Sequence, residues 1–142
     1  MAVQYDTNGL TLTLNGRRFT DFQEGDTIVL EFPNPATSKR RGVDGNYVVS
    51  KTSNGDECNL TLNLLKATDD DSFLNDALNQ DLPIVLEGSM QASFVRNGSD
   101  GIDSYSLEGG SITTKPTHTT NTIEGNDLMT YVINFATARR SV

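Results

Sequence analysis

Apolar and polar residues alternate along much of the chain, the pattern of strands with one buried face. Leucines alternate with threonine or asparagine within residues 10–14 and again within residues 60–64. The Asn15-Gly16 pair that follows the first run is a turn signal, so residues 9–20 are predicted to form a hairpin. Further strands are expected at 27–32, 47–50, 83–95 (bent at Gly88), 104–107, 111–114 and 129–138.

Only one segment, residues 69–80, has helical spacing. Its apolar side chains form one stripe, and Pro83 closes the segment. The Asp69-Asp70-Asp71 triplet lies where a helix N-terminus favours negative charge and a capping oxygen. The pattern predicts a mainly β fold, a β-sandwich or partial barrel with one short flanking α-helix at about 69–80, in a single domain spanning residues 1–142.

Two polar segments interrupt this pattern. Residues 33–46 have few side chains to bury and are predicted to form an extended loop. Loops of that length in a small domain are usually functional or mobile. Residues 115–127 form a second polar stretch, rich in threonine.

Composition narrows the function further. The 142 residues carry a formal net charge of −8, which argues against a general nucleic-acid binder. The longest apolar runs are triplets, far short of the roughly 20 residues of a membrane helix, and no signal peptide is visible. With Cys58 as the single cysteine, the chain forms no internal disulfide, which favours assembly in a reducing cytoplasm.

Candidate chemistry is sparse. His118, the only histidine, lies outside any nucleophile or metal motif and is expected to be an exposed loop residue. Cys58 is expected to be a buried structural thiol. Helix capping explains the Asp69-Asp70-Asp71 triplet better than a metal site does, and a hairpin turn explains residues 97–103 better than weak calcium binding. We therefore expect no catalytic, cofactor-binding or metal residues.

The basic cluster Lys39-Arg40-Arg41 stands out in an acidic chain. It is either a solvated loop or a contact arm that attracts an acidic surface on an identical copy. The helix region offers such a surface, and the Arg139-Arg140 pair could serve as a second cationic contact. The acidic side chains of this surface are Asp69, Asp70, Asp71, Asp76 and Asp81.

Several segments resemble the tail tube proteins of contractile-tailed bacteriophages, which are related to the tube proteins of type VI secretion systems. A Gly42-Val43-Asp44-Gly45 turn leads into a strand, as a Gly-Ala-Asp-Gly-like turn does in that family. The segment 60–68 then runs into the one helix, as a Thr-x-x-Leu-Leu-x-Thr-Ser-Pro-like segment does there. Asp69-Asp70 replaces the Ser-Pro pair, a departure that still allows a helix start. The motifs cover residues 42–78.

The resemblance implies a structural subunit without catalysis or cofactor, located in the virion tail and synthesised in the host bacterial cytoplasm. Six copies would close into a ring, and stacked rings would form a channel through which the phage DNA passes without specific binding. The implied partners are identical subunits and the tail sheath, tape-measure and baseplate proteins. Acidic walls would repel phosphate and keep transit fast.

On this interpretation the segment 33–46 makes the contact with the next ring. The expected inter-ring residues are Pro33, Asn34, Lys39, Arg40, Arg41 and Asp44, which face the acidic partner surface of Asp69, Asp70, Asp71 and Asp76. The first alternative is a β-sandwich module that decorates a virion or binds a carbohydrate or receptor, although tryptophan is absent and the tyrosines are scattered. A hydrolase or metal enzyme is the second alternative, and it lacks a clustered site.

Overall fold

The computed structural model of the chain describes residues 2–6, 10–22, 28–116, 122–123 and 128–142. Within these ranges it contains strands and one α-helix, α1 (Asp69–Leu78). The strands are β1 (Val3–Tyr5), β2 (Thr11–Leu14), β3 (Arg17–Phe19), β4 (Val29–Glu31), β5 (Thr37–Arg41), β6 (Tyr47–Lys51), β7 (Cys58–Leu65), β8 (Leu86–Arg96), β9 (Ser99–Ile112) and β10 (Leu128–Ser141).

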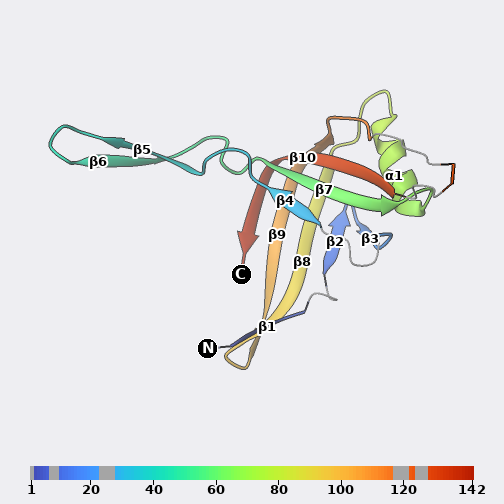
Figure 1. Cartoon of the computed structure of the whole chain (residues 1–142), viewed down its shortest axis with the longest axis horizontal. Coiled ribbons are helices and arrows are strands. Elements are labelled where there is room, and N and C mark those ends of the chain that lie inside the picture. Colours follow the sequence, from blue (N-terminus) through green and yellow to red (C-terminus); the bar gives the residue numbers. More distant parts are fainter. Residues whose placement is uncertain (1, 7–9, 23–27, 117–121, 124–127) are drawn as a thin grey trace.

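Eight of these strands form one antiparallel sheet that does not close on itself (Figure 1). Its order is β3-β2-β8-β9-β10-β7-β4, and β1 pairs with the far end of β8, on the same side as β2. β5 and β6 form a separate two-stranded sheet. The mainly β fold with one short helix is confirmed, and the large open sheet is consistent with a sandwich or partial barrel.

One hydrophobic core holds the two ends of this sheet together. In β2, Leu12 and Leu14 are buried, and in β7 the alternation buries Leu60, Leu62 and Leu64. These leucines belong to a single cluster, although β2 and β7 lie near opposite ends of the strand order. The sheet must therefore bend around a common core, and α1 packs onto it through Leu74 and other buried residues.

Glycines and asparagines at the predicted positions shape this sheet. Asn15 and Gly16 have φ of 51° and 78°, as the two-residue turn between β2 and β3 requires. The bend expected at Gly88 is confirmed, because the register of β8 against β9 shifts between Leu86 and Gly88. A Cβ atom at Gly88 would lie 1.7 Å from the carbonyl oxygen of Thr13, so only glycine fits where β2 crosses this point.

The structure corrects several expected boundaries. The strand expected at 83–95 begins only at Leu86, as β8 (Leu86–Arg96). The helix ends at Leu78 rather than residue 80, with Asn79 as its C-cap. The two strands expected at 104–107 and 111–114 are one strand, β9, because β8 and β10 pair with it through Gly110. Of the expected strand 27–32, the structure has β4 at Val29–Glu31, and residue 27, like residue 9 of the expected hairpin, lies outside the described residues.

Three strands are tied together at the end of the sheet remote from α1. Arg140 of β10 donates two hydrogen bonds of 2.9 Å to the carboxylate of Asp103 in β9, and Tyr5 of β1 donates a third. Asp103 is buried, and the hydrogen bonds from Arg140 lower its pKa. Among the described helices none is both long and apolar enough to cross a membrane.

This network makes an acid-sensitive contribution to stability. Because the pKa of Asp103 is lower in the folded than in the unfolded chain, its stabilisation is full above the unfolded value, about 3.9. It is lost as the pH falls through the lowered folded value. We expect Asp103→Asn to unfold at lower urea concentration than the parent at pH 7, and the difference to shrink as the pH falls below about 4. A difference that stays constant from pH 7 to about pH 2 would contradict this assignment.

Candidate assembly interface

β5 and β6 form a hairpin that projects from the body of the molecule, and we call residues 37–51 the arm (Figure 1). The strands pair from Thr37 with Lys51 to Arg41 with Tyr47. Every residue of both strands is exposed. The arm therefore lacks the apolar layer that normally covers a sheet. A two-stranded hairpin without such a layer is only marginally stable in water.

The prediction of an extended loop at residues 33–46 is therefore wrong in part, since Thr37–Arg41 is a strand. The reversal of the chain is limited to the tip, where Gly42 donates its amide to the carbonyl of Asn46 at 2.6 Å. Gly45 has a φ of 82°, which glycine adopts without strain. Three consecutive cations gave no strand signal, because strand patterns are recognised by a buried face and this strand has none.

The base of the arm is fixed to the body by polar contacts. Asn34 donates through its side-chain amide to Glu57 Oε2 at 3.2 Å and to the carbonyl of Asn54 at 3.3 Å. The amide of Thr52 donates to the carbonyl of Ala36 at 3.1 Å, and its hydroxyl donates to the carbonyl of Pro35. These bonds hold the entering and leaving chains together, and Glu57 also accepts a hydrogen bond of 3.1 Å from Asn134 of β10, which joins the base of the arm to the main sheet.

Each face of the arm combines cations with apolar side chains. Lys39 pairs with Val49 and Arg41 with Tyr47 on one face, while Arg40 pairs with Val48 on the other. The Lys39 ammonium lies 4.2 Å from the centre of the Tyr47 ring, a cation–π contact. Tyr47, Val48 and Val49 are 60%, 66% and 56% exposed, respectively. Such a surface is typical of one that is buried against a partner.

Charge separates the arm from the rest of the chain. The arm contains four cationic side chains, Lys39, Arg40, Arg41 and Lys51, and one carboxylate, Asp44, a net charge of +3. Since the whole chain carries −8, the remaining residues carry −11. Of the expected inter-ring residues, the cations and Asp44 thus lie on the arm, whereas Pro33 and Asn34 lie at its base.

Asp70 does not belong to the expected acidic partner surface. Its side chain is 1% exposed and forms an ion pair with Arg17 of β3, whose Nη2 lies 2.8 Å from Oδ1. Its Oδ2 accepts the backbone amides of Thr20 and Asp21 at 2.8 and 2.9 Å. Asp70 therefore joins the start of α1 to the chain after β3, and an acceptor so fully occupied is not available to a second copy.

Asp71 is also engaged within the chain. Its Oδ1 accepts a hydrogen bond of 2.7 Å from the hydroxyl of Tyr131, and its Oδ2 accepts the amide of Ala67 at 2.9 Å. Burial raises the pKa of Tyr131, and the hydrogen bond to Asp71 raises it further. Thr68 is the N-cap of the helix but makes no side-chain capping bond. The carboxylate of Asp71 instead accepts the amide of Ala67, the residue before the N-cap. Asp69 and Asp76 are exposed, as a docking surface needs.

The remaining candidates for chemistry form no metal cluster or activated nucleophile among the described residues. Cys58 is buried as expected, and burial raises the pKa of its thiol to about 11, which disfavours the nucleophilic thiolate. Residues 97–103 contain the turn between β8 and β9, and Asp103 there is held by Arg140. No group of three or more metal-ligating side chains occurs among the described residues. His118 lies outside them.

Sequence reasoning missed the apolar half of the arm. Tyr47, Val48 and Val49 fall in the strand predicted at 47–50 but outside the predicted interface, because a β pattern does not show which sheet a strand joins. The available signal was the turn at residues 42–46, which has basic residues directly before it and a β-rich run directly after it. A turn between two such runs predicts a hairpin in which the runs pair.

No family model fits this chain, and no curated protein is significantly similar to it in sequence. Functional inference therefore depends on the geometry above.

The buried position of Asp70 leads to a clear expectation for stability. We expect Asp70→Ala to lower the free energy of unfolding by about 2 kcal/mol, mainly because the backbone amides of Thr20 and Asp21 lose their acceptor, the buried carboxylate of Asp70. The ion pair adds little to this cost, since the Arg17 side chain is 37% exposed. Urea unfolding followed by circular dichroism measures the change.

Asp76→Ala is the matched control, since it removes an exposed carboxylate from the same helix. We expect it to change the free energy of unfolding by no more than about 0.5 kcal/mol. Equal effects of the two substitutions would contradict the role assigned to Asp70.

Proposed function

We propose that the chain is a structural subunit of a phage tail tube, which assembles with identical copies into stacked rings, each of six copies, around a channel for the genome. The observation that carries this proposal is the arm. It is an exposed cationic hairpin with apolar side chains on both faces, fixed at its base and directed away from an acidic body.

The position of the arm favours head-to-tail association. It lies at one end of the longest axis of the molecule, and α1 lies at the other (Figure 1). A contact between two different surfaces leaves one partner with an unused arm and the other with an unused acceptor surface. Association of this kind therefore continues along an axis, as a stack of rings requires.

The open sheet supports lateral closure. β3 and β4 are the margins of the strand order and each has one unpaired side among the described strands. Unpaired strand margins associate readily with other chains unless they are covered. In a ring each margin lies beside that of a neighbour, so closure satisfies both and limits the number of subunits.

The exposed face of β2, β8 and β9 suits the wall of a channel. Cross-strand rows such as Thr13, Ser89 and Ser106 place small polar side chains on this face. Its charged members on these three strands are carboxylates, Glu87, Asp100 and Glu108, and cations stand only at its flanks, Arg18 on β3 and Arg139 on β10. Carboxylates repel phosphate, so DNA would pass without being held.

A β-sandwich module for virion decoration or receptor binding is the second candidate. The observation that favours it is a hollow of about 680 Å³ between β1 and the β8–β9 hairpin, which is bordered by Tyr5, Phe94 and Ile102. Hollows of this size accommodate small ligands. This candidate leaves the charge and exposure of the arm without a purpose, which is why we rank it second.

Electron microscopy of the purified protein in negative stain separates these candidates. The tail tube proposal predicts annuli or hollow rods, with sedimentation that depends on protein concentration. Added salt should shift the population toward smaller species, because it screens exposed charge over about 10 Å at 0.1 M. Isolated globules at every protein and salt concentration would overturn the proposal.

Reversal of the arm charge provides the sharper test. We expect Lys39→Glu, Arg40→Glu and Arg41→Glu together to leave the subunit folded, because exposed charges contribute little to its stability. They should abolish rods, since the arm would then carry the same sign of charge as the body. The neutral triple variant with glutamine at these positions should show an intermediate defect.

Thr113→Glu with Thr114→Glu is the control, because it adds two carboxylates at exposed positions outside the arm. We expect it to form rods like the parent. If the arm triple variant also forms rods at the parent's concentration, the arm is not the contact between rings.

A further inference from the structure

A short apolar segment is exposed beside α1, between the helix and β8. In residues 79–85, Leu82, Ile84 and Val85 are 86%, 44% and 56% exposed. Single exposed apolar side chains are common on protein surfaces, but adjacent ones are typical of a surface that a partner covers.

This segment has a defined path although it forms neither helix nor strand. The amide of Ile84 donates to the carbonyl of Ala77 in α1 at 3.3 Å. The side-chain amide of Asn15 donates to the carbonyl of Val85 at 3.1 Å, which ties the segment to the β2–β3 turn. The apolar side chains are therefore presented on a prepared surface.

The segment of the sequence that contains these side chains carries carboxylates and no cations. Asp76 on α1 and Asp81 after it are both exposed, and no Lys or Arg occurs in the sequence from residue 69 to 87. We call the set Asp76, Asp81, Leu82, Ile84 and Val85 the acceptor patch.

The arm is complementary to the acceptor patch in both charge and polarity. One face of the arm carries Lys39 and Arg41 beside Tyr47 and Val49, so cations flank exposed apolar side chains. The acceptor patch has carboxylates beside exposed apolar side chains. Contact between the two would bury apolar surface on both sides and leave each cation near a carboxylate.

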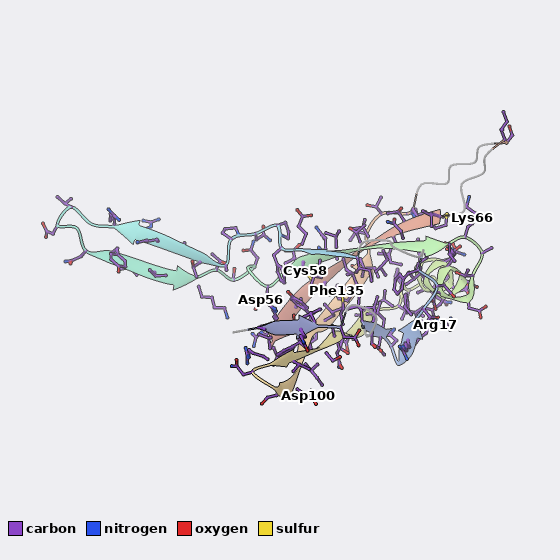
Figure 2. All side chains as sticks on the ribbon, turned by 60° about the horizontal axis from the view of Figure 1, so that its bottom comes forward. Arg17, Asp56, Cys58, Lys66, Asp100 and Phe135 are labelled. Atoms are coloured by element: carbon purple, nitrogen blue, oxygen red, sulfur yellow. The ribbon has the colours of Figure 1, made fainter. Side chains whose placement is uncertain are left out.

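The arm and the patch of one chain cannot meet. The arm projects from one end of the molecule, whereas α1 and the segment that follows it lie at the other end, in both views (Figures 1 and 2). Asn34 at the base of the arm is hydrogen-bonded to Glu57, which also accepts a hydrogen bond from Asn134 of β10, so a swing back across the sheet would break the contact of Asn34. The complementary surface must belong to a second copy.

We propose that the acceptor patch is the docking site for the arm of the next copy in the stack. This inference rests on the proposed assembly through the arm, and it replaces the acidic triplet at the start of α1 with Asp76, Asp81 and the apolar segment. Asp70 and Asp71 are excluded as principal contacts because β3, the chain after it and β10 occupy their carboxylates.

Mixed-disulfide formation tests the contact directly. Val49→Cys places a thiol on the arm and Leu82→Cys places one on the patch, whereas the native Cys58 is buried and stays unreactive. An assembled mixture of the two single variants should give a covalent dimer under mild oxidation, while Val49→Cys mixed with Val3→Cys should not. Val3 is a fair control because it is 54% exposed and lies on β1, away from the patch. Equal yields in both mixtures would overturn the proposal.

Charge exchange tests the energetic role of the patch. We expect Lys39→Glu with Arg41→Glu to raise the concentration needed for rods at least about tenfold, and Asp76→Lys with Asp81→Lys to do the same. The quadruple variant should recover rods, because the pairs are restored with reversed sign. Failure of the quadruple variant to assemble better than either double variant would contradict the contact.

The two proposals fail in distinguishable ways. If the parent protein forms no rods or annuli, the tube function and the acceptor patch fall together. If the parent assembles while Leu82→Cys gives no dimer and charge exchange gives no recovery, the tube function stands. The apolar segment would then face another surface, such as a ring neighbour or the sheath, and the acceptor assignment is wrong.

Discussion

A single core that two distant strands share is the constraint on which this molecule depends. The leucine rows of β2 and β7 bury their side chains in the same cluster, although three strands lie between these elements in the sheet order. The sheet can satisfy this only by bending, and Gly88 allows the bend because no side chain fits where the Thr13 carbonyl approaches. Nearly all of the large buried side chains are committed to this cluster. No buried side chain lies on β5 or β6, so the arm has no hydrophobic core of its own.

Polar anchors then set the directions of the parts that the core does not hold. Asp70 fixes the start of α1 to the chain after β3, and Asn34 with Thr52 fixes the base of the arm to the segment before β7. Both anchors use side chains that hydrogen-bond to backbone groups. A buried backbone group that is left without a hydrogen-bond partner costs free energy of folding. The helix and the arm are thus held in a defined relation at opposite ends, which an interface between copies needs.

The sequence was sufficient for those features that depend on local pattern. The alternating leucines predicted β2 and β7, and the asparagine-glycine pair predicted the turn at residues 15–16. It was insufficient where long-range contacts decide. Nothing near Asp70 in the sequence indicates that Arg17 and two amides 49 and 50 residues away surround it. The strand at Thr37–Arg41 was missed because a cationic hairpin buries neither face, and burial is what period-two patterns report.

The separation of charge also selects among the ways in which copies can meet. A contact between like ends would bring arm against arm, each with a net charge of +3, or one acidic end against another. Both arrangements place like charges together and are disfavoured, whereas arm against acidic end pairs opposite signs. The same residues that attract the correct surface therefore oppose contacts between like ends. When copies pair arm to acidic end in one direction, one end of the stack keeps an unused arm and the other an unused acidic end, so growth can continue.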